Sequence, residues 1–138
     1  MDQSMDNTVK GVSKGAYPVV DCENPELIFL ATGSEVGLAM EVAESMNEKK
    51  IRVVSMPCWE LFDQQDQQYR DQVLPPGVVA RIAVEAGIRQ GWDAYLGESG
   101  RFVGMTGFGA SAPASVLYEH FGITAENVAG QARELVGR

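Results

Sequence analysis

Residues 27–46 read LIFLATGSEVGLAMEVAESM, and this stretch predicts the class of fold. Residues 27–32 form a continuous apolar run, which is typical of a parallel strand buried on both faces. Gly33 ends the run. Ser34 can cap a helix that carries Glu35 in its first turn, where the helix dipole favours a negative charge. The apolar face expected for this helix is Val36, Ala39, Met40, Ala43 and Met46.

Short apolar runs and amphipathic segments alternate along the rest of the chain, a pattern typical of a mostly parallel sheet covered by helices on both faces. The run at residues 16–20 contains Pro18, which has no amide donor, so we expect an edge strand there. The other expected strands are 27–32, 51–55, 79–85 and 101–104. The helices expected after the first are 59–64, 66–73, 92–96, 111–121 and a last one capped by Thr124.

The composition is that of a folded domain. Of 138 residues, 45% are hydrophobic and 22% are charged, which excludes intrinsic disorder for the bulk of the chain. We expect a flexible lead-in at residues 1–14 and a single α/β domain at 15–138.

The net charge of −8 opposes binding to nucleic acids and anionic membranes. No apolar run reaches the roughly 18 residues that span a bilayer, and no signal-peptide pattern is present, so we expect a cytoplasmic protein.

Two cysteines, Cys22 and Cys58, and one histidine, His120, are too few for a structural zinc site. The sequence does not exclude a disulfide between the two cysteines, although reduced thiols are more usual in an acidic cytosolic domain. Cys58 precedes a short helix, a position that can activate a thiol, but no histidine is near it in sequence. His120 is placed as a favourable cation at the end of a helix. We expect structural roles for Cys58 and His120.

Two glycine-containing loops join a strand to a helix. Thr32-Gly33-Ser34-Glu35 has the form in which free helix amides hold a phosphate or carboxylate, but a tight turn with a helix cap explains it as well. Residues 104–111 (GMTGFGAS) space their glycines as GxxGxG, which matches no phosphate-binding fingerprint. Close backbone packing is the expected reason for these glycines.

Glu85 is the best single candidate for a polar role, because it stands at the carboxyl end of an expected strand, where open α/β sheets place ligands. Gly87 is expected to end that strand. The alternative for Glu85 is buried pairing with a neighbour. The acidic residues of segment 59–73 fit a solvated helical face better than catalysis, and they are Glu60, Asp63, Asp66 and Asp71.

Four blocks of the sequence resemble the C-terminal domain of transketolases. They are ATGSEVGLAMEVAE (31–44), IRVVSMPCWELFDQQ (51–65), VLPPGVVARIAVEAG (73–87) and FVGMTGFGASAPASVLYEHFGIT (102–124). Their order and spacing fit throughout, so the resemblance covers nearly everything from about Gly15 to Leu135. Related domains of 2-oxo-acid dehydrogenases and deoxyxylulose-phosphate synthase share this fold and are the nearest competitors.

The resemblance implies a three-layer α/β/α sandwich with a five-stranded mixed sheet, in which the first strand is antiparallel to the other four. It also implies that the strand ending at Thr32 lies beside the strand ending at Glu85, with crossovers that leave in opposite directions. Ligands of open α/β sheets bind at such switch points. The residues expected to line this crevice are Thr32, Gly33, Ser34, Glu85, Ala86 and Gly87. We predict that any small ligand, an anion or a regulator, binds there.

For function, the resemblance implies a homodimeric enzyme that transfers a two-carbon ketol unit from a ketose phosphate to an aldose phosphate in the pentose phosphate pathway. The cofactors of that family are thiamine diphosphate and a divalent metal, Mg or Ca, and they lie between two other domains. The GDG motif with its downstream Asn, the histidine cluster and the activating glutamate of those domains do not occur here. No catalytic, cofactor-binding or metal-binding residue is therefore carried over, and we expect the isolated chain to be inactive.

Two hypotheses remain. In the first, the chain is a structural domain that supports the dimer and the neighbouring domain of a transketolase. In the second, it is a stand-alone assembly or small-molecule-sensing module. Docking predicts an exposed apolar patch of several hundred Å², whereas a sensor predicts a polar surface with a formed pocket. The aromatic residues to inspect for such a patch are Trp59, Phe62, Trp92 and Tyr95.

Overall fold

The computed structural model describes residues 14–33, 35–46, 49–88, 91–97, 99–105 and 123–136. Five strands form one sheet in the order β1-β3-β2-β4-β5. They are β1 (Tyr17–Val20), β2 (Leu27–Ala31), β3 (Ile51–Ser55), β4 (Arg81–Ile88) and β5 (Arg101–Met105). β1 is antiparallel to β3, whereas β3, β2, β4 and β5 run parallel to one another. The five-stranded mixed sheet expected from the resemblance is confirmed.

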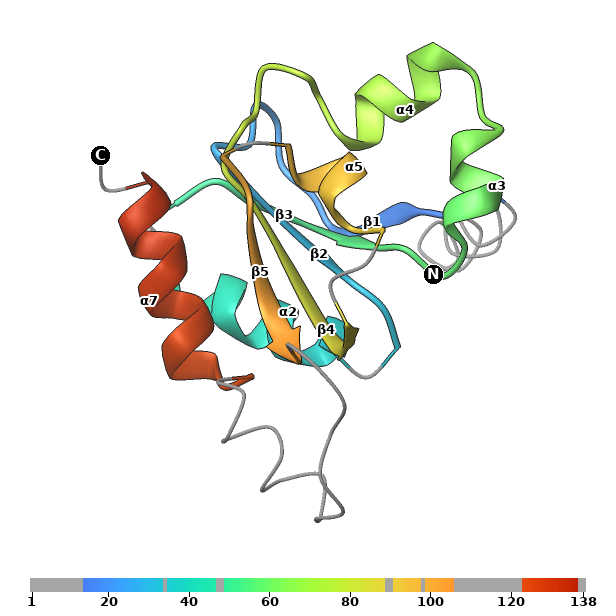
Figure 1. Ribbon diagram of the computed structural model, residues 1–138. Helices are drawn as coiled ribbons and strands as arrows, with labels where there is room; N and C mark the ends of the chain where they lie inside the picture. Colours follow the sequence, from blue (N-terminus) through green and yellow to red (C-terminus); the bar gives the residue numbers. More distant parts are fainter. Residues whose placement is uncertain are drawn as a thin grey trace, which may run out of the picture.

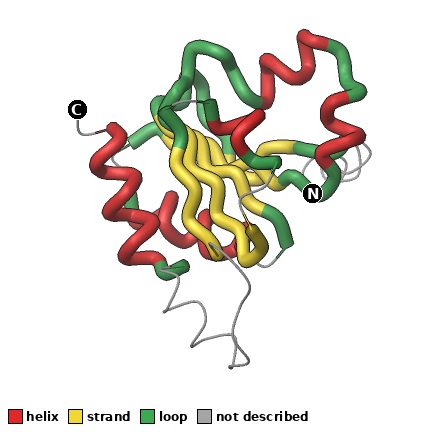
Figure 2. Tube along the Cα trace, viewed as in Figure 1, coloured by secondary structure: helices red, strands yellow, loops and turns green. Residues whose placement is uncertain are grey.

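Helices cover both faces of this sheet. The described helices are α2 (Glu35–Ser45), α3 (Trp59–Asp63), α4 (Gln67–Val73), α5 (Asp93–Leu96) and α7 (Ala125–Val136). α2 and α7 lie on one face, and α3, α4 and α5 lie on the other (Figures 1 and 2). The architecture is therefore the expected three-layer sandwich. The lead-in up to residue 13, Ser34 and the expected helix at 111–121 with His120 lie outside the described residues.

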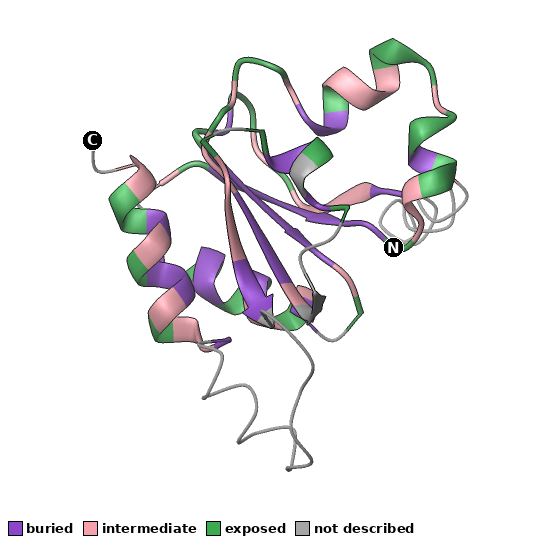
Figure 3. Ribbon diagram, viewed as in Figure 1, coloured by how far each residue is buried: buried purple, intermediate pink, exposed green. Residues whose placement is uncertain are grey.

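The central strand β2 is buried along its whole length, as its apolar run predicted (Figure 3). Its side chains alternate between two hydrophobic cores. Leu27 and Phe29 face the core under α2 and α7, whereas Ile28 and Leu30 face the core under α3, α4 and α5. β1 is an edge strand, which agrees with the presence of Pro18, and its four residues are half-buried.

The buried stripe of α2 differs from the expected one. Met40, predicted to be in the core, is 40% exposed, and Val42, which was not predicted, is 1% exposed. The apolar residues that α2 and the turn after it bury are Ala39, Val42, Ala43 and Met46, whose spacing of three and four matches one helical face. Met40 is one residue beyond Ala39, so the helix turns it about 100° away from that face.

β4 also differs from its prediction at both ends. The strand begins at Arg81 rather than Val79, which is 61% exposed. It continues past Gly87 to Ile88, because a bulge places two extra residues in β4: Glu85 pairs with Gly104, and the next pair joins Ile88 to Met105. The prediction that Gly87 ends the strand is therefore wrong, since a bulge accommodates a glycine without ending the pairing.

The four aromatic residues selected for a surface patch belong instead to the second core. Phe62, Trp92 and Tyr95 are buried, and Trp59 packs against them half-buried. The rings of Trp59 and Trp92 meet edge to face with their centroids 4.9 Å apart. This edge-to-face contact is one that aromatic pairs prefer in protein interiors. These rings hold α3 and α5 to the sheet and do not form a docking surface.

Candidate functional site

The predicted crevice lies between the carboxyl ends of β2 and β4, which are neighbours in the sheet. Ala31 pairs with Val84, so Thr32 and Glu85 are the next residues of the two strands. The Thr32 hydroxyl donates a hydrogen bond of 2.6 Å to the Glu85 carboxylate. The structure thus brings together two of the residues predicted for the crevice. It also agrees with the alternative interpretation of Glu85, in which this side chain pairs with a neighbouring residue and not with a ligand.

Gly33 forms the turn between this hydrogen bond and α2. Its φ of 56° lies in the left-handed region that favours glycine, and a Cβ there would meet no atom within 4 Å. The helix begins directly after it, with hydrogen bonds from the amides of Glu35 and Val36 to the carbonyls of Thr32 and Gly33. The tight turn expected at this loop is therefore present, while the capping residue Ser34 is outside the described part.

Two carboxylates set the charge of this region. Glu35, in the first turn of α2, is only 5% exposed, and Glu85 is half-buried in the neighbouring strand. A negative charge at the start of a helix is favourable because it interacts with the helix dipole. Negative charges repel a phosphate, and both Glu35 and Glu85 have interaction partners in the structure, so these two residues do not indicate an anion site. Ligand binding by Thr32, Gly33, Ser34, Glu85 and Gly87 stays a prediction.

Gly104 packs against the Glu85 side of the crevice. A Cβ at Gly104 would overlap the carbonyl oxygen of Glu85 and the ring of Phe102. Close backbone packing, the reason predicted for the glycine-rich loop, therefore holds for this glycine. The rest of that loop, from residue 106 to 111, lies outside the described residues.

Both cysteines are free thiols. Cys58 stands at the N-cap of α3, where its amide donates to the carbonyl of Gly15 and its side chain makes no capping hydrogen bond. Burial raises the pKa of the Cys22 thiol, with Arg52 opposing that shift. A raised pKa disfavours the thiolate, which is the nucleophilic form. Cys22 is thus not an activated nucleophile.

Glu60, Asp63 and Asp66 are exposed, as expected for a solvated helical face, and some of the acidic residues of segment 59–73 also make structural contacts. Asp66 caps α4 by accepting a 2.8 Å hydrogen bond from the Tyr69 amide. Asp63 accepts a 2.9 Å hydrogen bond from the Tyr95 hydroxyl. Burial, helped by this bond, raises the pKa of Tyr95. Across the described residues, no group of three or more His, Cys, Asp or Glu side chains could hold a metal ion, and no helix is long and apolar enough to cross a membrane.

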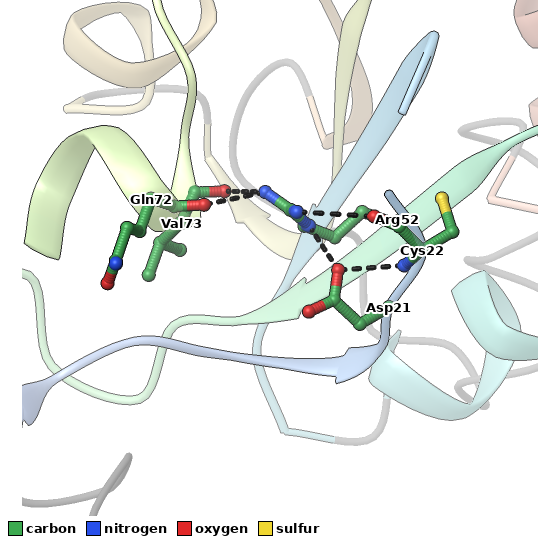
Figure 4. A network of polar contacts seen from close by, with 5 residues as sticks. All are labelled: Asp21, Cys22, Arg52, Gln72 and Val73. Atoms are coloured by element: carbon green, nitrogen blue, oxygen red, sulfur yellow. Dashed lines mark hydrogen bonds and ion pairs between the residues drawn. The ribbon is translucent and has the colours of Figure 1, made fainter. Parts of the chain in front are cut away.

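A buried arginine that sequence reasoning missed organises the opposite end of the sheet. Arg52 of β3 forms a 2.7 Å ion pair with Asp21 and donates to the carbonyls of Gln72 and Val73 at 2.7 and 3.1 Å (Figure 4). A longer bond of 3.4 Å reaches the carbonyl of Cys22. The signal that could have found it is an arginine inside an otherwise apolar strand, since buried charges are almost always paired.

Known proteins similar to this chain share both its sequence and its fold. A family model described as the transketolase-like TK C-terminal domain matches residues 15–124. Transketolase 2 of Vibrio parahaemolyticus serotype O3:K6 is 54% identical in an alignment of 131 positions that covers 93% of this chain and 20% of that protein. The solved transketolase from Leishmania mexicana is 51% identical with a TM-score of 0.87, over 94% of this chain and 19% of that one. The transketolase of Pichia stipitis solved with sedoheptulose-7-phosphate is 36% identical with a TM-score of 0.82, at the same coverage. The chain therefore spans about one fifth of the length of these relatives.

Proposed function

This chain belongs to the transketolase family as its C-terminal domain, and from that premise we propose that it serves a complete transketolase as a supporting domain without catalytic residues of its own. The observation that carries this proposal is the share of each protein that the alignment covers. Identity of 54% extends over 93% of this chain but over only 20% of the relative, so the chain corresponds to one part of a larger protein.

For the whole protein we propose transfer of a two-carbon ketol unit from a ketose phosphate to an aldose phosphate in the pentose phosphate pathway, in the cytoplasm. The relative from Pichia stipitis was solved with sedoheptulose-7-phosphate, which supports a sugar phosphate as the substrate class. The cofactors proposed for the complete enzyme are thiamine diphosphate and a divalent metal, Mg or Ca. The proposed partners are the other transketolase domains and the second subunit of a homodimer.

The described residues of this chain offer no ligand set for the metal of that cofactor. None of their acidic, cysteine or histidine side chains form a group of three that could hold a metal ion. Glu85, the best placed carboxylate, accepts a hydrogen bond from Thr32 instead. We therefore propose that the other domains bind the cofactor, and no step of the reaction is assigned to residues here.

A chimaeric enzyme tests this function directly. This chain would replace the matching C-terminal fifth of Vibrio parahaemolyticus transketolase 2, and ketol transfer would be measured for the chimaera, for the relative without that fifth, and for this chain alone. We expect activity only in the chimaera. A chimaera that folds and dimerises without activity contradicts the proposal. Tight binding of thiamine diphosphate and Mg²⁺ by this chain alone, measured by calorimetry, also contradicts it.

The competing function is a stand-alone assembly or sensing module. An immunoblot of the source cell's lysate separates the two, because a domain of a transketolase would be detected in a band several times larger than 14.9 kDa. A band at 14.9 kDa would support the module. In either case, Thr32, Gly33, Ser34, Glu85 and Gly87 are the residues that we propose for a regulatory ligand at the switch point.

A further inference from the structure

A pocket of about 510 Å³ lies at the amino ends of β4 and β5, the end of the sheet opposite the predicted crevice. Its lining residues come from the segment between α4 and β4 and from the region around the end of α5. Its volume is within the range of about 300–1,000 Å³ that is usual for small-molecule sites. The lining residues are Leu74, Pro76, Val78, Val79, Arg81, Leu96, Gly97 and Ser99.

Arg81 is the cation of this pocket, and backbone carbonyl groups hold it in place. Its Nε donates to Val78 at 2.9 Å, and its Nη1 donates to Tyr95 at 2.6 Å. Its Nη2 donates to Leu74 and Pro75 at 3.3 and 2.9 Å. A guanidinium has five N–H donors, so these four bonds leave one N–H of Nη1 without a partner among the described residues.

Arg81 differs from two other arginines near the amino ends of the parallel strands in having no counterion among the described residues. Arg52 pairs with Asp21, and Arg101 pairs with Glu134. Within the described part of the chain, no carboxylate forms an ion pair with Arg81, which contacts only carbonyl dipoles. Burial lowers the pKa of Arg81, which reflects the cost of holding this charge away from water. An anion in the pocket would offset that cost.

The walls determine which anion fits. Five of the lining side chains are apolar, and Val79 is 61% exposed, the most exposed of the large hydrophobic residues in the described part. Covering Val79 would remove apolar surface from water, which is favourable. A phosphate has no apolar part and needs several donors, whereas the side chains of the described lining residues supply only one N–H of Arg81 that binds no described carbonyl and the Ser99 hydroxyl. A carboxylate attached to an apolar body satisfies both the cation and the walls.

We propose that this pocket binds a small organic carboxylate whose carboxylate group accepts a hydrogen bond from Arg81 and whose apolar body covers Val79. The bond is single rather than bidentate, because four of the five donors already hold backbone carbonyls. The site is independent of the transketolase role, since it rests on contacts within this chain alone.

Titration of the ¹⁵N-labelled chain with hexanoate, followed by amide chemical shifts, tests the proposal. We expect saturable shifts at the amides of the lining residues Val78, Val79, Arg81, Gly97 and Ser99. Hexanol, which lacks the charge, should bind about tenfold more weakly, as expected for the loss of one charged hydrogen bond. Inorganic phosphate should produce no saturable shift at these amides. Equal affinity for hexanol and hexanoate, tighter binding of phosphate, or no saturable shift with hexanoate overturns the proposal.

Two matched substitutions locate the site. Val79→Asp is expected to leave the fold intact because Val79 is exposed, and it supplies a carboxylate to the cation, so hexanoate binding should fall at least about tenfold. Leu61→Asp places the same charge on α3, where Leu61 is 38% exposed and outside the pocket, and should leave the affinity unchanged. Unaltered binding to Val79→Asp, or equal losses in the two variants, overturns the proposal.

Discussion

Arg52 and Arg81 lie in one row of the sheet, on either side of Ile28, and together they bind the four consecutive carbonyl groups of residues 72–75. Ile28 pairs with Arg52 in β3 and with Arg81 in β4. Arg52 donates hydrogen bonds to the first two carbonyls, and Arg81 donates to the last two. The end of a helix leaves carbonyls without intrahelical donors, so these two side chains stabilise the end of α4 where a glycine cap would otherwise act.

Arg52→Ala is predicted to destabilise the domain by about 3 kcal/mol, because it leaves the carbonyls of Gln72 and Val73 without these donors and removes a buried guanidinium from its ion pair with the more exposed Asp21. The Arg52 side chain is only 10% exposed. The matched control is Arg101→Ala, whose ion pair with Glu134 is more exposed and should contribute under about 1 kcal/mol. Urea unfolding of both variants measures the difference. Equal losses would contradict the assigned role of Arg52.

Thr32→Val should reduce the unfolding free energy by about 1–2 kcal/mol, because it removes the donor to the Glu85 carboxylate while keeping the size of the side chain. Thr32→Ser keeps the hydroxyl and serves as the control. Denaturant unfolding compares the two. If Thr32→Val is as stable as Thr32→Ser, the hydrogen bond does not stabilise the junction of β2 and β4.

Two glycine-to-alanine substitutions should have opposite effects. Gly104→Ala forces a methyl group into the Glu85 carbonyl and the Phe102 ring, which predicts a loss of about 1–3 kcal/mol. Gly130→Ala, within α7, adds a methyl group where no atom lies within 4 Å, and should stabilise the domain by about 0.5–1 kcal/mol. Thermal unfolding of both variants shows whether each substitution lowers or raises the stability of the domain. A neutral Gly104→Ala would mean that β4 and β5 can move apart at little cost.

Stability should fall at alkaline pH because of Tyr95. Its pKa is raised above the ordinary value of 10 by burial and by the bond to Asp63, so the unfolded chain loses this proton at lower pH than the folded one. The stabilisation is complete below pH 10 and is lost as pH rises toward the higher folded value. Denaturant unfolding between neutral and alkaline pH should therefore show a shallower decline for Tyr95→Phe than for the unmodified chain.

A second variant distinguishes the two causes of that shift. Asp63→Asn keeps an oxygen acceptor for Tyr95 but removes the charge, so its alkaline decline should lie between those of the unmodified chain and Tyr95→Phe. Burial also raises the pKa of Tyr69, which is present in all three proteins. Tyr69 should therefore contribute to the loss of stability at alkaline pH in each of them. Identical slopes in all three proteins would show that Tyr95 is not the titrating group.

Much of the fold could be read from local sequence patterns. The apolar run of β2, the proline of β1 and the apolar segments of β3 and β5 each predicted a strand that the structure contains. A buried face gives a strand or helix a characteristic spacing of apolar residues. This spacing can be recognised from residues that are close together in the sequence. The errors came from finer features: Met40 lies one helical position from the buried stripe, and Gly87 occupies a bulge rather than a strand end.

The candidate site could be predicted only in part. The resemblance placed Thr32 beside Glu85 through the order of the strands, but neither residue by itself indicates the other, because 53 positions separate them. Arg52 and Arg81 were visible as charges within apolar strands, while their partners in the 72–75 segment depend on how the loop after α4 crosses the sheet.

Local sequence patterns were enough to predict the α/β class and the position of most strands, because periodicity, glycine and proline act within a few residues along the chain. The family followed from the resemblance of four sequence blocks to transketolases. Which polar groups meet depends on the tertiary fold: Thr32 meets Glu85, Arg52 meets Asp21, and Arg81 binds carbonyl groups with no carboxylate partner among the described residues. Those meetings follow from strand order and register, which bring distant residues into one row of the sheet, and no local pattern carries that information.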